Sequence, residues 1–154
     1  MLVLLALHLF TASIGESGNP ALTLNEIRHT FRTAVDSETN ARHLIIYTGS
    51  STPLRLGYTG AATILMAKHT LNPMAKLNYF ENGKALLELA IQREPGNMEL
   101  RFLRYCIQSN IPALLAYHQN KDEDYRSICK SLSTIKDEGL RQMIVESKLF
   151  YPCQ

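Results

Sequence analysis

Apolar residues recur at helical spacing along most of the chain from Leu24 onward. Leu24, Ile27 and Phe31 follow one another at i, i+3 and i+7, which places them on one face of a helix. Just before them, Thr23-Leu-Asn-Glu26 matches a capping box, in which the Thr and Glu side chains each accept a hydrogen bond from the other residue's backbone amide. The pattern therefore predicts a helix that begins after Thr23.

Six further helices follow from the same periodicity and from residues that start or stop helices. We expect them between Ser37 and Gly49, over residues 54–69 and 75–93, from Asn97 to Gln108, and after the caps Asn120 and Asp137. We find no alternating strand pattern and no hairpin turn signal. Seven helices with short connections predict an all-α fold, a compact bundle of antiparallel helix pairs.

The predicted helix over residues 75–93 has the widest apolar surface of the chain. Four residues share one face, and two more form a second flank: Leu77, Phe80, Leu87 and Ile91, then Leu86 and Leu89. An apolar face this wide predicts that the helix contacts other helices on two sides.

A small residue, a bulky residue and an alanine stand in order on this helix, at Gly83, Leu87 and Ala90, and Pro95 follows its end. This order resembles the second helix of a tetratricopeptide repeat and the proline between repeats. The small residue lets the paired helix approach, and the proline sets the turn. Leu56-Gly57 is similar to the Leu-Gly pair of the family's first helix.

Two departures limit what the repeat resemblance implies. The interval from Pro53 to Pro95 exceeds the repeat length of about 34 residues. Tyr105 also stands where the next repeat has a small residue. The resemblance therefore implies one degenerate repeat-like hairpin inside a compact bundle, and no extended array of repeats.

Short segments spread over residues 58–104 carry a second resemblance. They are Tyr58-Thr-Gly60-Ala61, Ala67-Lys68, Asn72-Pro73, Lys76-Leu77, Tyr79-Phe80 and Glu99-Leu-Arg101-Phe-Leu-Arg104. In these segments the chain resembles an uncharacterised family of exported bacterial all-helical proteins. The resemblance implies a helical fold and export, and it implies no activity.

Residues 1–10, MLVLLALHLF, are almost continuously apolar, and small or polar residues follow them. This is the layout of a signal peptide, and the run is too short to span a bilayer, which needs about 20 apolar residues. No Lys or Arg precedes Arg28, so a basic start is missing and a buried N-terminal helix is the alternative. We predict a signal peptide over residues 1–15, a linker over residues 16–22 and one helical domain over residues 23–154, exported to the periplasm or beyond the cell.

The three cysteines, Cys106, Cys129 and Cys153, match no zinc-binding or CxxC spacing. In an oxidising compartment Cys106 and Cys129 can pair if their helices are neighbours. The simpler interpretation is that both are buried small apolar residues. Cys153 lies in the tail, and we expect it to be free.

Composition and motifs exclude several function classes. The chain is 45% hydrophobic and 19% charged, which is typical of a folded globular domain. Its net charge of +2 is far from that of a nucleic-acid binder, which carries a strongly basic surface. We expect no membrane-spanning segment after the signal peptide is removed. No catalytic, phosphate-binding or calcium-binding motif is present, and the histidines fall on separate segments, so we predict no catalytic residue, metal or cofactor.

One group of residues suggests a binding site. Arg101 and Arg104 share a helix face, Gln108 continues that row, and together they suit a carboxylate or phosphate. If the helices over residues 54–69 and 97–108 are neighbours, Tyr58 and Lys68 line the same groove. The alternative is that the arginines pair with Glu94, Glu99 or another helix's acid.

Three functions remain open from these observations. The first is a non-enzymatic module that binds a protein or peptide, or acts as a scaffold. The second is an exported enzyme with a site assembled from Tyr58, Lys68, Arg101 and Arg104 and a carboxylate such as Glu99. The third is a structural subunit that attaches to an envelope assembly through Leu149-Phe150-Tyr151. The sequence leaves the oligomeric state open.

Overall fold

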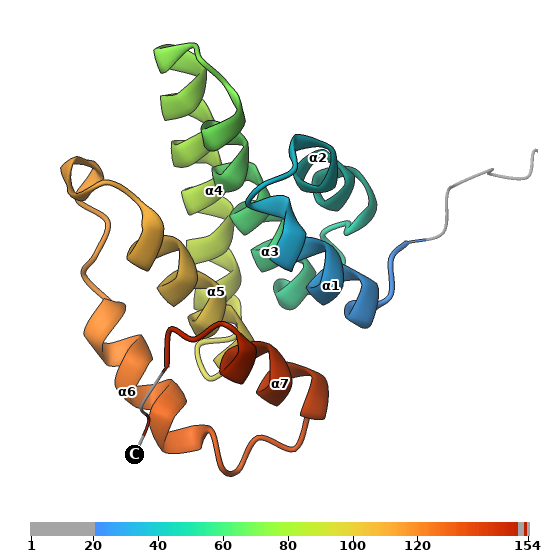
Figure 1. Cartoon of the computed structure of the whole chain (residues 1–154), viewed down its shortest axis with the longest axis vertical. Helices are drawn as coiled ribbons and strands as arrows, with labels where there is room; N and C mark the ends of the chain where they lie inside the picture. The colour runs from blue at the N-terminus through green and yellow to red at the C-terminus, as the bar shows by residue number, and fades with distance from the viewer. Residues whose placement is uncertain (1–20, 151–152, 154) are drawn as a thin grey trace, which may run out of the picture.

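The structure is a computed structural model that describes residues 21–150 and 153. These residues form seven α-helices and two short 3-10 helices and contain no strand, which confirms the predicted all-α class (Figure 1). The α-helices are α1 (Leu24–Ala34), α2 (Glu38–Tyr47), α3 (Pro53–Met66), α4 (Pro73–Arg93), α5 (Met98–Asn110), α6 (Lys121–Ser131) and α7 (Glu138–Glu146). The 3-10 helix η1 (Ala67–His69) follows α3, and η2 (Ala113–Leu115) lies between α5 and α6. The predicted signal peptide lies outside the described residues.

Side-chain caps fix several of the helix starts. The predicted capping box forms at α1, where the Thr23 amide donates to Glu26 Oε2 at 2.8 Å and the Glu26 amide donates back to the Thr23 hydroxyl. Asp137 also caps α7 as predicted, since its Oδ1 accepts from the Leu140 amide at 3.0 Å. Asn120 stands directly before α6 but makes no capping hydrogen bond with its side chain, so that part of the prediction is wrong.

The α3–α4 pair is the most closely packed part of the fold, and two glycines make the approach possible. Gly60 on α3 and Gly83 on α4 face each other across the helix contact. A Cβ atom built on Gly83 lies 2.5 Å from the Gly60 carbonyl oxygen and 2.7 Å from the Ile64 amide nitrogen. Because these neighbours are backbone atoms, the two helices have no room for a side chain at this position.

We therefore expect Gly83→Ala to lower the free energy of unfolding by about 2 kcal/mol, although alanine is intrinsically the better helix former by about 1 kcal/mol. Urea denaturation followed by circular dichroism measures the change. Gly96→Ala is the matched control, because nothing lies within 4 Å of a Cβ atom there, and its change should stay within about 0.5 kcal/mol. Equal stability of the two variants would contradict the close approach.

Two apolar clusters form the core. The first surrounds α3 and draws on α1, α2, α4 and α5. The second lies between α5, α6 and α7 and is rich in aromatic rings. Phe80, Leu87 and Ile91 are buried as predicted, but Leu77 is 47% exposed, so the prediction that it faces the core is wrong. Leu77 instead lines an open cavity between the end of α3, the start of α4 and η2, where the neighbouring helices do not close over it.

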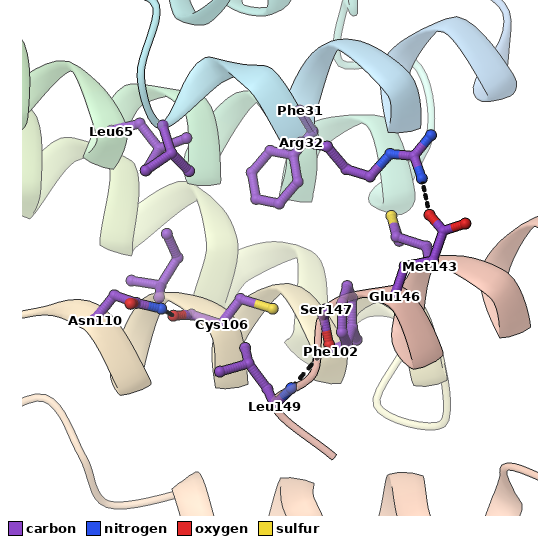
Figure 2. A pocket seen from close by; sticks show the side chains of 12 residues that line it. Phe31, Arg32, Leu65, Phe102, Cys106, Asn110, Met143, Glu146, Ser147 and Leu149 are labelled. Carbon is purple, nitrogen blue, oxygen red and sulfur yellow. Dashed lines mark hydrogen bonds and ion pairs between the residues drawn. The ribbon is translucent and has the colours of Figure 1, made fainter. Parts of the chain in front are cut away.

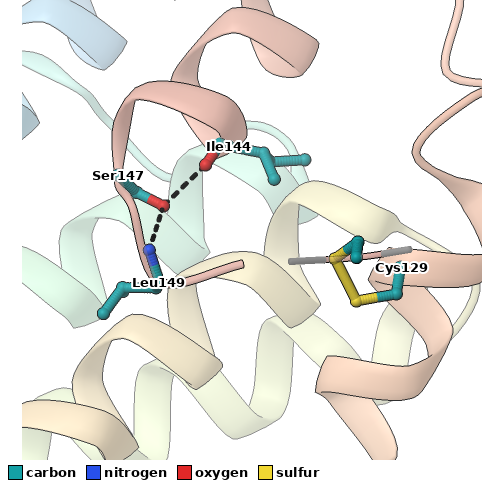
Figure 3. Close-up of a disulfide and its surroundings, with 5 residues drawn as sticks. Cys129, Ile144, Ser147 and Leu149 are labelled. Carbon is teal, nitrogen blue, oxygen red and sulfur yellow. Dashed lines mark hydrogen bonds between the residues drawn. A yellow bond between two sulfur atoms is a disulfide. The ribbon is translucent and has the colours of Figure 1, made fainter. Parts of the chain in front are cut away.

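The expectation that Cys153 is free is wrong, and the alternative Cys106–Cys129 pair does not form, whereas Cys106 is an unpaired thiol, as the simpler interpretation holds. Cys129 on α6 is bonded to Cys153, with 5.1 Å between the Cα atoms, and Cys106 is free (Figure 3). The reason is the course of the chain after α7, which turns back towards α6. Phe150 enters the second cluster, where its ring lies 4.6 Å from Tyr105 and 5.5 Å from Tyr125 between centroids. Phe150 is therefore part of the core, which leaves it unavailable as a surface anchor, and Tyr151 lies outside the described residues.

Candidate functional site

The structure places Tyr58 in a buried polar network, where no substrate can reach it in this conformation. Tyr58 has no exposed surface, and its hydroxyl donates to Glu99 Oε1 at 2.5 Å. Arg28 from α1 holds both oxygens of Glu99, with Nε to Oε1 at 2.7 Å and Nη2 to Oε2 at 2.6 Å. Arg28 also pairs with Asp137 at 2.7 Å. The network therefore joins α3 and α5 to α1 and to the start of α7.

Burial and charge fix the protonation of this network. Burial, and then the nearby charge of Glu99, raise the pKa of Tyr58 well above its ordinary value, so the phenol stays protonated and donates. The hydrogen bond from Arg28 lowers the pKa of Asp137. These shifts stabilise one arrangement of donors and acceptors, which is what a structural network requires.

Arg101 and Arg104 lie together, but acids neutralise both of them. Arg104 is 5% exposed and donates to both oxygens of Asp124, with Nε to Oδ2 at 2.7 Å and Nη2 to Oδ1 at 2.9 Å. Arg101 pairs with the same Asp124 at 3.1 Å and with Glu123 at 2.9 Å. Arg104 additionally reaches Glu88 at 3.0 Å. The two arginines thus tie α5 to α6 and α4.

Lys68 and Gln108 do not join the arginines or Tyr58 in one groove. Lys68 lies on η1 and pairs with Asp36 at 2.9 Å, with both side chains more than half exposed. Gln108 is 1% exposed, and its side-chain amide has no hydrogen-bond partner among the described residues. The five residues therefore occupy four places: two adjacent arginines, one buried tyrosine, one buried glutamine and one surface lysine.

A different feature, a pair of adjoining apolar cavities, offers an open surface. One, of about 390 Å³, lies between α1, α5 and α7 (Figure 2). The other, of about 510 Å³, lies between the end of α3, the start of α4 and the α5–α6 connection. Leu65, Ile107 and Asn110 line both cavities, so the two meet there. We call the joined cavities the α5 groove.

One stripe of α5 forms the floor of the α5 groove. Phe102, Cys106 and Asn110 stand at i, i+4 and i+8, and a helix rises about 12 Å over that interval. Burial raises the pKa of Cys106 to about 12, so its thiol is protonated at neutral pH and acts as an apolar surface, not a nucleophile. The floor is therefore about as long as two turns of a helix, and it is apolar except for Asn110 at one end.

Exposed apolar side chains mark the rim of the groove at α4 and η2. Leu77 is 47% exposed and Leu114 is 84% exposed, and both line the larger cavity. Leu71 and Met74 stand just before Leu77 in the chain and are 96% and 66% exposed. Large aliphatic side chains gathered in this way are typical of a surface that another molecule covers.

Sequence reasoning missed the α5 groove because its residues come from distant segments. The lining includes Phe31 on α1, Met143 on α7 and Leu114 on η2. The one sequence signal was the apolar stretch that follows Pro112, which is too short for a core helix. Its exposure depends on how the α5–α6 connection crosses the surface, and periodicity does not specify that.

Within the described residues, no helix is long and apolar enough to cross a membrane. No group of three or more His, Cys, Asp or Glu residues in that part of the chain is arranged to hold a metal ion. No protein-family model matches the chain, and neither a curated protein nor a solved structure matches it.

Proposed function

We propose that the protein is a non-enzymatic binding module that holds an amphipathic helix of a partner protein in the α5 groove. The observation that carries the proposal is the apolar double cavity with Leu77 and Leu114 exposed at its rim. Covering this surface removes apolar area from water, which stabilises a complex by about 25 cal/mol for each Å² buried. A third cavity, of about 260 Å³ beside Arg28 and Gln142, is smaller and is lined mostly by polar residues.

The lining of the groove favours a helix over an extended peptide. An extended backbone needs hydrogen-bond partners along its length, and a helix satisfies its own. The floor offers few partners, since the Asn110 amide already donates to the Cys106 carbonyl at 2.7 Å. The walls are themselves helices, so side chains at i, i+4 and i+7 of a bound helix can pack between them.

The polar residues of the fold support a binding role over catalysis. Tyr58 and Glu99 are buried against Arg28, and Arg101 and Arg104 are neutralised by Asp124. Inside the groove, the one ionisable sulfur, Cys106, stays protonated. The groove therefore offers shape and apolar surface, which suit binding.

Export remains part of the proposal. The apolar residues 1–10 support a signal peptide, and the Cys129–Cys153 disulfide supports an oxidising compartment such as the periplasm. The Gly60–Gly83 approach supports the repeat-like hairpin, because a small residue at that position is what lets paired repeat helices meet. We propose that the hairpin supports one wall of the groove through the start of α4.

A display selection tests the proposed function. A library of helical peptides is selected on the wild-type protein and then assayed against Leu77→Asp/Leu114→Asp, which places two charges on the rim. We expect enriched peptides with apolar residues at i, i+4 and i+7, and we expect the double variant to weaken their binding by more than about tenfold, which corresponds to about 1.4 kcal/mol.

Ile46→Asp is the matched control, because Ile46 is 66% exposed on α2 and lies outside the groove. It should bind the selected peptides like the wild type. The proposal fails if the selection enriches no peptide, or if the enriched peptides bind the rim variant and the wild type equally well.

A further inference from the structure

We infer that the helix bound in the α5 groove carries acidic residues at the end that lies over α4 and η1. The inference rests on the proposed function and adds the chemistry of the partner. Its basis is the charge distribution along the groove, which is positive at one end and neutral at the other. An apolar floor with cations at one end matches a helix that has an apolar face and terminal carboxylates.

The larger cavity, at α4, has only cations among its charged lining residues. Lys68 and Lys76 line it, and no acidic residue of the described chain does. The ammonium group of Lys76 forms no ion pair or side-chain hydrogen bond with any described residue, whereas its backbone amide donates to the Asn72 carbonyl, so the charge of the side chain is uncompensated. Lys68 pairs with Asp36, but that pair is exposed on both sides and such pairs contribute at most about 1 kcal/mol. Lys68 can therefore turn to a bound carboxylate at little cost.

The smaller cavity differs in charge. Arg32 on α1 and Glu146 on α7 line it and form an ion pair with each other across its edge (Figure 2). The charged lining of this end therefore sums to zero, whereas the end at α4 has an uncompensated cation in Lys76. Because the two ends of the groove differ in charge, a helix that has acidic residues at just one of its ends should bind in a single preferred orientation.

Three synthetic peptides test the inference. They share one leucine stripe at i, i+4 and i+7 over about four helical turns and differ only in the pairs of residues at both ends, which are Glu-Glu, Gln-Gln or Lys-Lys. Their dissociation constants are measured by fluorescence anisotropy at low and high salt. We expect the Glu peptide to bind about tenfold more tightly than the Lys peptide at low salt, and we expect high salt to reduce the difference.

Charge-reversed proteins provide the decisive comparison. Lys68→Glu/Lys76→Glu should reverse the order of the three peptides. Lys130→Glu/Lys136→Glu changes the net charge equally at two exposed lysines outside the groove and should leave the order unchanged.

The outcomes separate the two proposals. If all three peptides bind equally and Leu77→Asp/Leu114→Asp still weakens them, the acidic partner is wrong and the binding module stands. If no peptide binds, or if a simple alkyl carboxylate binds and no peptide does, both are wrong. If Lys130→Glu/Lys136→Glu changes the order of the peptide affinities as much as Lys68→Glu/Lys76→Glu does, the net charge of the protein and not the groove determines the preference. The inference then fails.

Discussion

Replacing Glu99 with alanine is expected to lower the free energy of unfolding by about 3–5 kcal/mol, the range measured when one partner of a buried ion pair is removed. Glu99 is 3% exposed and accepts two hydrogen bonds from Arg28 and one from Tyr58. Without it, Arg28 keeps Asp137 alone, and the Tyr58 hydroxyl keeps the Met143 sulfur at 3.8 Å. The buried guanidinium of Arg28 then keeps one of its two carboxylate partners.

The expected loss comes from the charge left behind, and a triple variant isolates that cause. Arg28→Met/Tyr58→Phe/Glu99→Leu removes the cation, the hydroxyl and the carboxylate together. Apolar replacement of a complete buried network is often neutral or stabilising. We therefore expect the triple variant to be more stable than Glu99→Ala, although it differs from the wild type at three positions.

Thermal and urea unfolding measure both variants. Glu99→Ala should melt more than about 10 °C below the wild type. Glu138→Ala is the control, because Glu138 pairs with Arg141 at 2.7 Å with 70% and 47% of the two side chains exposed, and it should cost less than about 1 kcal/mol. If Glu99→Ala and Glu138→Ala lose equal stability, or if the triple variant is the least stable, the account of the network is wrong.

Much of the fold follows from local rules that the sequence displays. The capping box at Thr23 and the cap at Asp137 each depend on a few adjacent residues, and both form as predicted. Leu100, Leu103 and Ile107 are buried as their spacing predicts. Caps and helical faces depend mostly on neighbours within one or two turns, so the sequence predicts most of them, with Asn120 and Leu77 as the exceptions.

The networks and the groove depend on tertiary placement, and the sequence does not display that. Arg28 and Glu99 are 71 positions apart, and no local pattern links them. The pairing of Arg104 with an acid on another helix was among the alternatives, but the choice of Asp124 required knowing that α6 packs on α5. The prediction for Leu77 fails in the opposite way, since its spacing is right for the core, yet its side chain is 47% exposed and lines an open cavity.

The candidate site lies where apolar side chains remain exposed, and not where charged residues gather. Two of the charged residues that first suggested a site, Glu99 and Arg104, are buried and form ion pairs within the fold. Leu77, which was expected in the core, remains exposed, and so does Leu114 on η2. Buried polar groups use their hydrogen bonds within the fold, whereas exposed apolar side chains still face water. A partner molecule can therefore stabilise the protein by covering the exposed apolar side chains.

Replacing Asp124 with alanine is the second change expected to cost about 3–5 kcal/mol. Asp124 has no exposed surface and accepts from Arg104 twice and from Arg101 once. Without it, Arg104 keeps only Glu88, whose side chain is 28% exposed. Asp122→Ala is the matched control, because Asp122 is exposed in the same first turn of α6 and loses the same helix-dipole interaction without an ion pair.

Glu99→Ala and Asp124→Ala should increase local unfolding in different parts of the protein. Hydrogen exchange measured by mass spectrometry distinguishes the two patterns. Glu99 connects α1, α3 and α5 and, through Arg28, the start of α7, so its loss should raise exchange through the whole core. Asp124 connects α6 to α5, the helix on which α6 mainly packs. Asp124→Ala should therefore raise exchange first in α6 and the α5–α6 connection. That connection carries Leu114, so peptide binding in the groove should weaken before α3 and α4 lose protection. A uniform rise in exchange across all helices would contradict the local role of Asp124.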